Sequence, residues 1–139
     1  MTQVRTVPAS HGTRLEVSHV VAEPPAAAWD LLVDTHRWPD WGPTITGVEA
    51  TDRRIRTGTT GRIQLAAGPW LPFEITDCDP EARSWTWNVA CVPATCHRVE
   101  TLGEERCRIV FELPTVAAGY VPVCLRALEA LADCLEEGV

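Results

Sequence analysis

The C-terminal stretch, residues 117–137, constrains the fold more than any other part of this sequence. At about 100° per residue, its large apolar residues fall on one face of a helix, and its charged residues fall on the opposite face. The apolar face holds Val121, Cys124, Leu125, Leu128, Leu131, Ala132 and Leu135, and the charged face holds Arg126, Glu129, Asp133, Glu136 and Glu137. The pattern predicts one long amphipathic helix.

Smaller side chains widen the apolar face of this predicted helix. Val123, Ala127, Ala130 and Cys134 lie between the two faces. A helix that lies on a surface needs an apolar stripe only a little over about 100° wide, and this arc is wider. The excess indicates that a sheet wraps the helix or that part of the helix faces a space. The high helix propensity of alanine is an alternative explanation for Ala127 and Ala130.

Short alternating segments fill most of the remaining chain and predict an antiparallel sheet. Turn signals separate these segments at intervals typical of a meander. Seven strands are expected, at residues 15–21, 45–51, 59–67, 70–78, 83–91, 95–102 and 106–113. Pro24 and Pro25 end the first strand and open a short helix at residues 26–33, which a second short helical turn follows. Residues 1–13 carry no period, so we expect a loosely ordered segment there, which either frays or pairs loosely.

The totals exclude several classes of protein. A chain of 139 residues is long enough for one domain with a real core. Its net charge of −7, with scattered arginines as its only Lys or Arg residues, argues against binding to nucleic acid or to an anionic membrane. We find neither a signal-peptide pattern nor an apolar run that approaches the length of a membrane span. The expected location is therefore cytoplasmic.

The six cysteines lack the spacing of a metal site or a redox motif. There is no C-x-x-C, and most of the cysteines stand among apolar neighbours, as buried thiols do. Cys91, Cys96 and His97 flank a predicted hairpin turn, but no second pair of zinc ligands is present. We therefore expect reduced cysteines and no metal. A cross-strand disulfide between Cys91 and Cys96 stays open at this point.

The segment after the first strand resembles a known family. It reads A-E-P-P-A-A-A-W-D-L-L-V-D and then R-W-P-D-W-G-P, with Trp38 and Trp41 three residues apart. This is similar to the opening of the polyketide cyclase/dehydrase-like branch of the START-related (SRPBCC) superfamily. The resemblance implies an α+β helix-grip fold, in which a seven-stranded antiparallel sheet wraps a long C-terminal helix and two short helices follow the first strand. It also implies a pocket between the sheet and the long helix.

Strand parity predicts which side chains face that interior. The bulky candidates are Phe73, Trp85, Trp87, Val99 and Phe111, and the polar candidates are His19, Asp77, His97 and Thr101. Such large rings either line a cavity or fill the interior completely. For His19, a satisfied histidine within the sheet is the main interpretation, and ligand contact is the alternative.

Two hypotheses about function follow from different classes. The first is a protein that binds a small hydrophobic or aromatic molecule, lipid-like or polyketide-like, without a cofactor. The second is a polyketide cyclase or dehydratase in which His97 and Tyr120 act as acid and base. Motifs for hydrolases, metalloproteases and phosphate binding are absent from the sequence. A domain that only associates with a partner is a third possibility.

Overall fold

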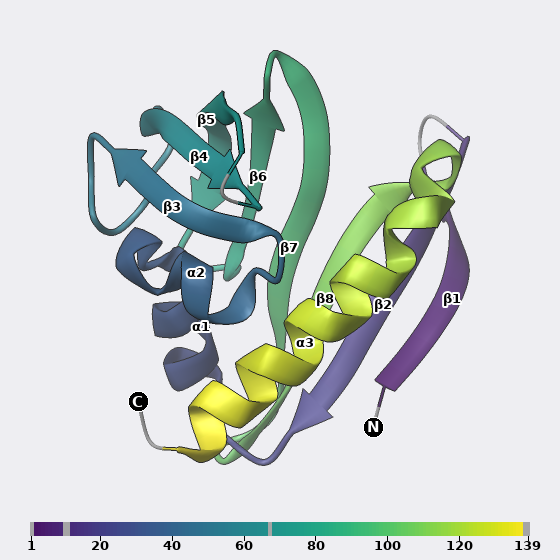
Figure 1. Cartoon of the computed structure of the whole chain (residues 1–139). Helices are drawn as coiled ribbons and strands as arrows, with labels where there is room; N and C mark the ends of the chain where they lie inside the picture. The colour runs from purple at the N-terminus through teal and green to yellow at the C-terminus, as the bar shows by residue number, and fades with distance from the viewer. Residues whose placement is uncertain (1, 10–11, 67, 138–139) are drawn as a thin grey trace.

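One long helix lies across one face of a curved antiparallel sheet (Figure 1). The computed structural model describes residues 2–9, 12–66 and 68–137. Its eight strands within these ranges are β1 (Thr2–Ala9), β2 (Gly12–Val21), β3 (Ile45–Ala50), β4 (Thr60–Leu65), β5 (Trp70–Asp79), β6 (Ser84–Val89), β7 (Val92–Gly103) and β8 (Arg106–Pro114). The helical elements are α1 (Pro25–Val33), η1 (Thr35–Arg37), α2 (Trp38–Trp41), η2 (Thr115–Tyr120) and α3 (Val121–Glu136).

The sheet order is β1-β2-β8-β7-β6-β5-β4-β3, with antiparallel pairs throughout. β3 to β8 form the expected meander, and β2 closes against β8. The predicted α+β helix-grip fold is thereby confirmed, with eight strands in the described chain where the sequence predicted seven.

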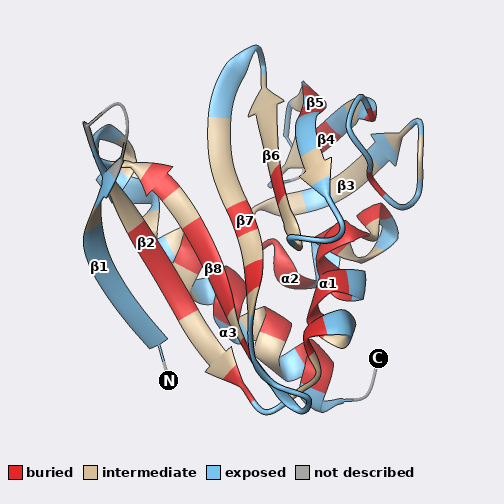
Figure 2. Ribbon diagram, turned by 180° about the vertical axis from the view of Figure 1, so that it is seen from behind, coloured by how far each residue is buried: buried red, intermediate tan, exposed pale blue. Residues whose placement is uncertain are grey.

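The additional strand is β1, in the segment that we expected to be loosely ordered. Thr2–Ala9 pairs with β2 along its whole length, from Thr2 opposite His19 onward. Its described side chains are exposed or half-buried, as Figure 2 shows for this edge of the sheet. Backbone hydrogen bonds hold this edge strand to β2, and neither of its faces is buried. Its sequence therefore needs no alternation of apolar and polar residues. This is why periodicity missed it.

α3 buries the face that the sequence predicted and part of its flank. Leu128 and Leu131 are fully buried, each worth about 1.5–3 kcal/mol of hydrophobic stabilisation. Ala127 and Cys134, from the flank of small residues, are also buried. The regular α-helix begins at Val121, later than predicted. The preceding turn is a 3₁₀ helix, and Pro122 stands in the first turn of α3, where its missing N–H costs nothing.

The continuous helical segment Thr115–Glu136 is long and apolar enough to cross a membrane by length and composition alone. The expectation that no segment approaches a membrane span is wrong by this measure. In the structure, however, α3 packs against β2, α1 and α2 (Figure 1). Leu128, Leu131 and Leu135 of this helix are buried. These buried side chains belong to the protein core, whereas 22% of the apolar window as a whole is buried.

The strand register separates the two cysteines at the β6–β7 hairpin. Cys91 lies in the turn itself, whereas Cys96 pairs across the sheet with Thr86 and Glu112. A cross-strand disulfide between Cys91 and Cys96 is therefore not available in this register. The described residues also contain no group of three or more His, Cys, Asp or Glu side chains that could hold a metal ion.

A network of ion pairs covers the outer face of the sheet across β1, β2, β7 and β8. At its centre, the Glu16 carboxylate accepts hydrogen bonds from Arg98 at 2.7 Å and from Arg5 at 3.0 Å. Arg98 also bonds Glu100 and Glu112. Glu16 is 7% exposed, so this carboxylate depends on its partners to remain charged.

We expect acid to remove the stabilisation that Glu16 provides. Burial raises the pKa of Glu16, but hydrogen bonds from Arg98 and Arg5 outweigh burial, so the pKa lies below its ordinary value of 4.5. Because the folded pKa is the lower one, the contribution is present above the ordinary value and is lost as the pH falls through the folded pKa. Glu16→Gln should cost about 1–3 kcal/mol in urea unfolding at neutral pH and progressively less at acid pH.

The matched control for this change is Glu104→Gln, in the exposed turn after β7, because Glu104 makes no ion pair within the described residues. It should leave the free energy of unfolding within about 0.5 kcal/mol. If the loss in free energy of unfolding caused by Glu16→Gln stayed constant down to acid pH, it would contradict a lowered pKa for Glu16.

Gly61 on β4 is a second testable position. A Cβ atom there would overlap the Glu49 carbonyl oxygen and would lie 2.9 Å from a ring carbon of Phe73. Gly61→Ala should therefore destabilise the protein by about 1–3 kcal/mol or more, since the backbone of β3 must move. At Gly103 the same Cβ meets nothing within 4 Å, so Gly103→Ala should change stability little. Urea unfolding of both variants compares them, and equal effects would contradict the packing described here.

Candidate functional site

An arc of aromatic rings lines the space between the sheet and the helices. Trp38 of α2 stacks on Trp85 of β6, with ring centroids 5.5 Å apart and planes 5° apart. Trp85 in turn stacks on His97 of β7 at 3.9 Å, and His97 meets the Phe111 ring edge-on at 4.9 Å. Trp41 closes the arc against Phe111 at 5.9 Å. Each such pair adds about 0.5–1.5 kcal/mol beyond its buried area.

Two adjoining cavities lie beside this arc. The smaller, of about 50 Å³, lies between α2, α3 and strands β6 to β8, and its lining includes Trp85, His97 and Ala127. The larger, of about 270 Å³, lies between β3, β4, β6, β7 and η2. The two share five lining residues: Thr44, Ile45, Trp87, Thr95 and Tyr120. We treat them as a small and a large compartment of one site.

The lining of both compartments is apolar or uncharged throughout the described residues. The other surface hollows are open and are lined by charged side chains, such as Arg37 and Asp40 or Glu49 and Arg62. An internal apolar site with a few polar groups is the usual form of a small-molecule site.

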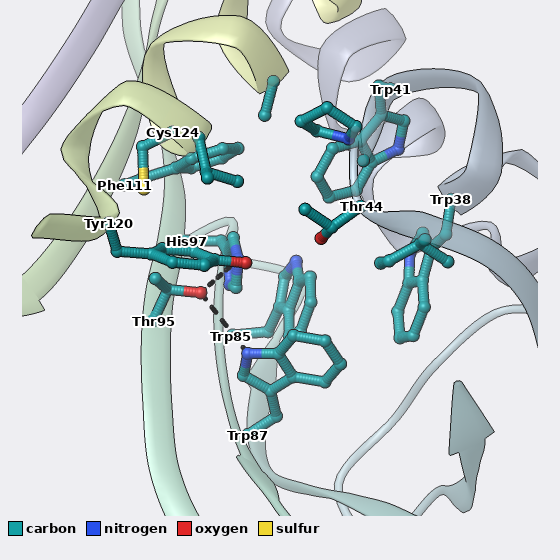
Figure 3. Close-up of a pocket in the computed structure, with 15 residues that line it drawn as sticks. Trp38, Trp41, Thr44, Trp85, Trp87, Thr95, His97, Phe111, Tyr120 and Cys124 are labelled. Atoms are coloured by element: carbon teal, nitrogen blue, oxygen red, sulfur yellow. Dashed lines mark hydrogen bonds between the residues drawn. The ribbon is translucent and has the colours of Figure 1, made fainter. Parts of the chain in front are cut away.

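His97 is a buried, neutral member of this lining. Its side chain bonds the Thr95 hydroxyl through Nε2 at 2.9 Å, and the Trp87 indole N–H donates to the same hydroxyl at 3.4 Å (Figure 3). Burial lowers the pKa of His97 to about 3, and the Trp85 backbone opposes this shift only in part. At neutral pH the ring is therefore uncharged and held by Thr95.

The Tyr120 hydroxyl points into the same space from the start of α3 (Figure 3). Tyr120 is 45% exposed as a residue, but its hydroxyl end faces the cavity beside Thr44. Burial raises the pKa of Tyr120, and its interaction with the Thr44 side chain offsets this partly. Tyr120 thus stands at the boundary between the site and the surface.

Five of the predicted site residues surround the cavity, and four lie elsewhere. The structure brings together Trp85, Trp87, His97, Phe111 and Tyr120. Phe73 and Val99 are buried in the core and do not line either compartment. His19 lies on the face under α3, on β2 next to the edge strand, where it bonds Thr2 of β1.

The prediction that Asp77 faces inward is wrong. A β-bulge between Ile75 and Asp77 shifts the register, so that Ile75 pairs with Trp87 and Asp77 pairs with Thr86. The bulge reverses the parity of the strand. Asp77 is exposed, and Cys78 turns inward to bond the Ile55 carbonyl. Thr101, another predicted inward residue, is exposed near the end of β7.

Sequence reasoning did not place Trp38, Trp41, Thr44 and Thr95 in the site. The W-x-x-W spacing had marked the first two as a feature of the family, and both indoles are buried in the arc. Thr95 shares the strand parity of His97 and lies beside a second irregularity, between Thr86 and Asn88 in the β6–β7 pairing. No signal in the sequence identifies that irregularity.

The curved sheet, the gripped helix and the internal apolar site define a helix-grip protein of the SRPBCC class. Residues 12–132 match the family model described as "Polyketide cyclase / dehydrase and lipid transport", and the chain belongs to this family. The resemblance stated from residues 22–43 is thereby confirmed. No curated protein matches the sequence.

Solved structures share the fold at low sequence identity. The Zhui aromatase/cyclase from a Streptomyces species is 19% identical, with a TM-score of 0.69 over 96% of this chain and 94% of that one. A norcoclaurine synthase point mutant from Thalictrum flavum is 15% identical, with a TM-score of 0.65 over 98% and 99%. Protein Ms6760 from Mycobacterium smegmatis is 15% identical, with a TM-score of 0.67 over the full length of both chains. These likenesses establish the fold.

The environment of His97 generates a direct test. With a pKa of about 3, its ring should remain neutral from about pH 8 to about pH 5, whereas an ordinary histidine titrates near 6.5. The ring Cε1–H resonance of His97 should therefore stay constant over this range in the folded protein. The same resonance should titrate in urea-unfolded protein, which serves as the control. A folded-state midpoint above about pH 5 would contradict the burial and bonding described here.

Proposed function

We propose that this protein binds a small hydrophobic or aromatic molecule, lipid-like or polyketide-like, between its sheet and α3. One observation carries the proposal, namely the pair of adjoining compartments lined by indole, phenyl and aliphatic groups without a charged side chain among the described residues. Burial of apolar ligand surface there is worth about 25 cal/mol per Å². A cavity of about 150 Å³ accommodates benzene, so the large compartment has room for more than one ring.

The family name supports a small hydrophobic ligand as the general class, and the fold is shared with an aromatase/cyclase. A nucleic acid or an anionic membrane is not part of the proposal, since the net charge is −7. The cytoplasmic location stays a prediction from the sequence.

The second candidate is an aromatic polyketide cyclase or dehydratase with His97 and Tyr120 as acid and base. The observation that favours it is that both side chains line the small compartment. A general base works best with a pKa near the operating pH, however, and the pKa of His97 is about 3. Thr95 also occupies its Nε2. These observations make binding without turnover the stronger proposal.

A filled-cavity variant tests the binding proposal. Ala94 of β7 lines the large compartment, and Ala94→Phe adds a ring in that space. N-phenyl-1-naphthylamine, an uncharged fluorescent probe, should bind the unmodified protein, and its affinity should fall about tenfold or more in the variant because the two rings compete for one volume. Fluorescence titration measures both constants.

Thr101→Phe is the matched control, because it adds the same ring to the same strand at an exposed position outside both compartments. It should bind the probe as the unmodified protein does. If Ala94→Phe kept full affinity, or if both variants lost affinity equally, the probe would be bound elsewhere and the proposal would fail.

A further inference from the structure

Buried indole donors without partners mark the small compartment. Two buried indole N–H groups in the lining of this compartment lack a hydrogen bond among the described residues: Trp41 Nε1 and Trp85 Nε1. Most buried polar groups in proteins are hydrogen-bonded, so such a group calls for an explanation. Two other indole N–H groups in this lining have hydrogen-bond acceptors: Trp38 donates to the Leu32 carbonyl and Trp87 donates to the Thr95 hydroxyl.

Trp85 is the donor with the clearest direction. The residue is 1% exposed, and Figure 3 shows its indole nitrogen directed into the space that the Tyr120 and Thr44 hydroxyls also face. An indole N–H only donates, so its partner must be an acceptor. The stack of Trp85 between Trp38 and His97 holds the ring in this orientation.

The two volumes indicate what each compartment holds. About 50 Å³ is a third of the cavity of about 150 Å³ that is known to hold benzene, so this compartment suits one small functional group. About 270 Å³ is enough for two fused rings. Because five residues line both compartments, one ligand can occupy the two at once.

The charge of the lining restricts that functional group further. Arg, Lys, Asp and Glu are absent from the described lining of both compartments, and His97 is neutral. A carboxylate placed there would be a buried charge without a counter-ion, which is strongly unfavourable. A carbonyl oxygen accepts a hydrogen bond and carries no charge.

We propose that the ligand is an uncharged aromatic ketone of about two fused rings, whose carbonyl oxygen accepts the Trp85 Nε1–H in the small compartment while its rings fill the large one. This inference rests on the proposed binding function and adds the chemical class of the ligand. It also assigns Trp85 a ligand-recognition role that its packing alone does not require.

A matched pair of probes tests the assignment. In 2-acetylnaphthalene a carbonyl oxygen stands where 2-isopropenylnaphthalene has a methylene group, so the two have nearly the same shape. Displacement of N-phenyl-1-naphthylamine gives both affinities. The ketone should bind the unmodified protein about three- to tenfold more tightly than the hydrocarbon, and 2-naphthoic acid should bind more weakly than either at neutral pH.

Trp85→Phe keeps an aromatic ring and removes the N–H. In this variant the preference should reverse, so that the ketone binds more weakly than the hydrocarbon, because its carbonyl is then buried without a donor. The hydrocarbon affinity should stay within about threefold of its original value, which also shows that the site still folds.

Two measurements remain informative if Trp85→Phe does not fold. Ala127→Leu fills the small compartment from α3 and should abolish the preference for the ketone, whereas Ala130→Leu, outside both compartments on the same helix, should retain it. In the unmodified protein, the Trp85 indole N–H proton resonance should move downfield with the ketone and not with the hydrocarbon.

The outcomes separate the two proposals. If neither naphthalene binds, the binding function itself fails. If both bind equally to the unmodified protein, or if the ketone preference survives in Trp85→Phe, the binding function stands and the ketone assignment is overturned.

Discussion

The stack of Trp38, Trp85 and His97 is the contact on which the rest of the structure depends. It joins the short helices after β2 to the middle of the β6–β7 pair, two parts of the chain that are far apart in sequence. Trp38 is fully buried and donates its indole N–H to the Leu32 carbonyl, so it also holds the end of α1. The short helices are thereby held against the sheet on one side of α3, and the space that remains between them becomes the cavity.

α3 completes the wall of the cavity with small side chains, and its large side chains lie elsewhere on the helix. Its buried leucines lie on the side of α3 that packs toward β2, whereas Ala127 and Cys124 face the small compartment with little side-chain volume. The wide apolar arc of the sequence had two explanations, a helix that faces a space and a preference for alanine in helices. For Ala127 the explanation is that the helix faces a space. Ala130, in contrast, faces the outer hollow between α2 and α3 and does not reach the cavity.

The sequence predicts the fold better than the site, for a physical reason. Strands with one buried face leave a period of two, and α3 leaves a period of 3.6, so most elements can be recognised. β1 leaves no period because neither face is buried. Site positions depend on register, and one extra residue in a strand turns every later side chain to the other face. The bulge after Ile75 moved Asp77 out of the interior. This bulge cannot be recognised from spacing.

The burial of His97 and Trp85 affects both catalysis and ligand binding. Catalysis by a histidine requires a ring that gains and loses a proton near neutral pH. The stacking of His97 on Trp85 and its bond to Thr95 exclude water from the ring, and its pKa falls to about 3. The same burial raises the free-energy cost of leaving the Trp85 N–H without an acceptor, because water cannot reach it to accept a hydrogen bond. Desolvation by the aromatic arc thus has two effects. It makes His97 a poor acid or base, and it increases what a single neutral acceptor on the ligand contributes to binding affinity.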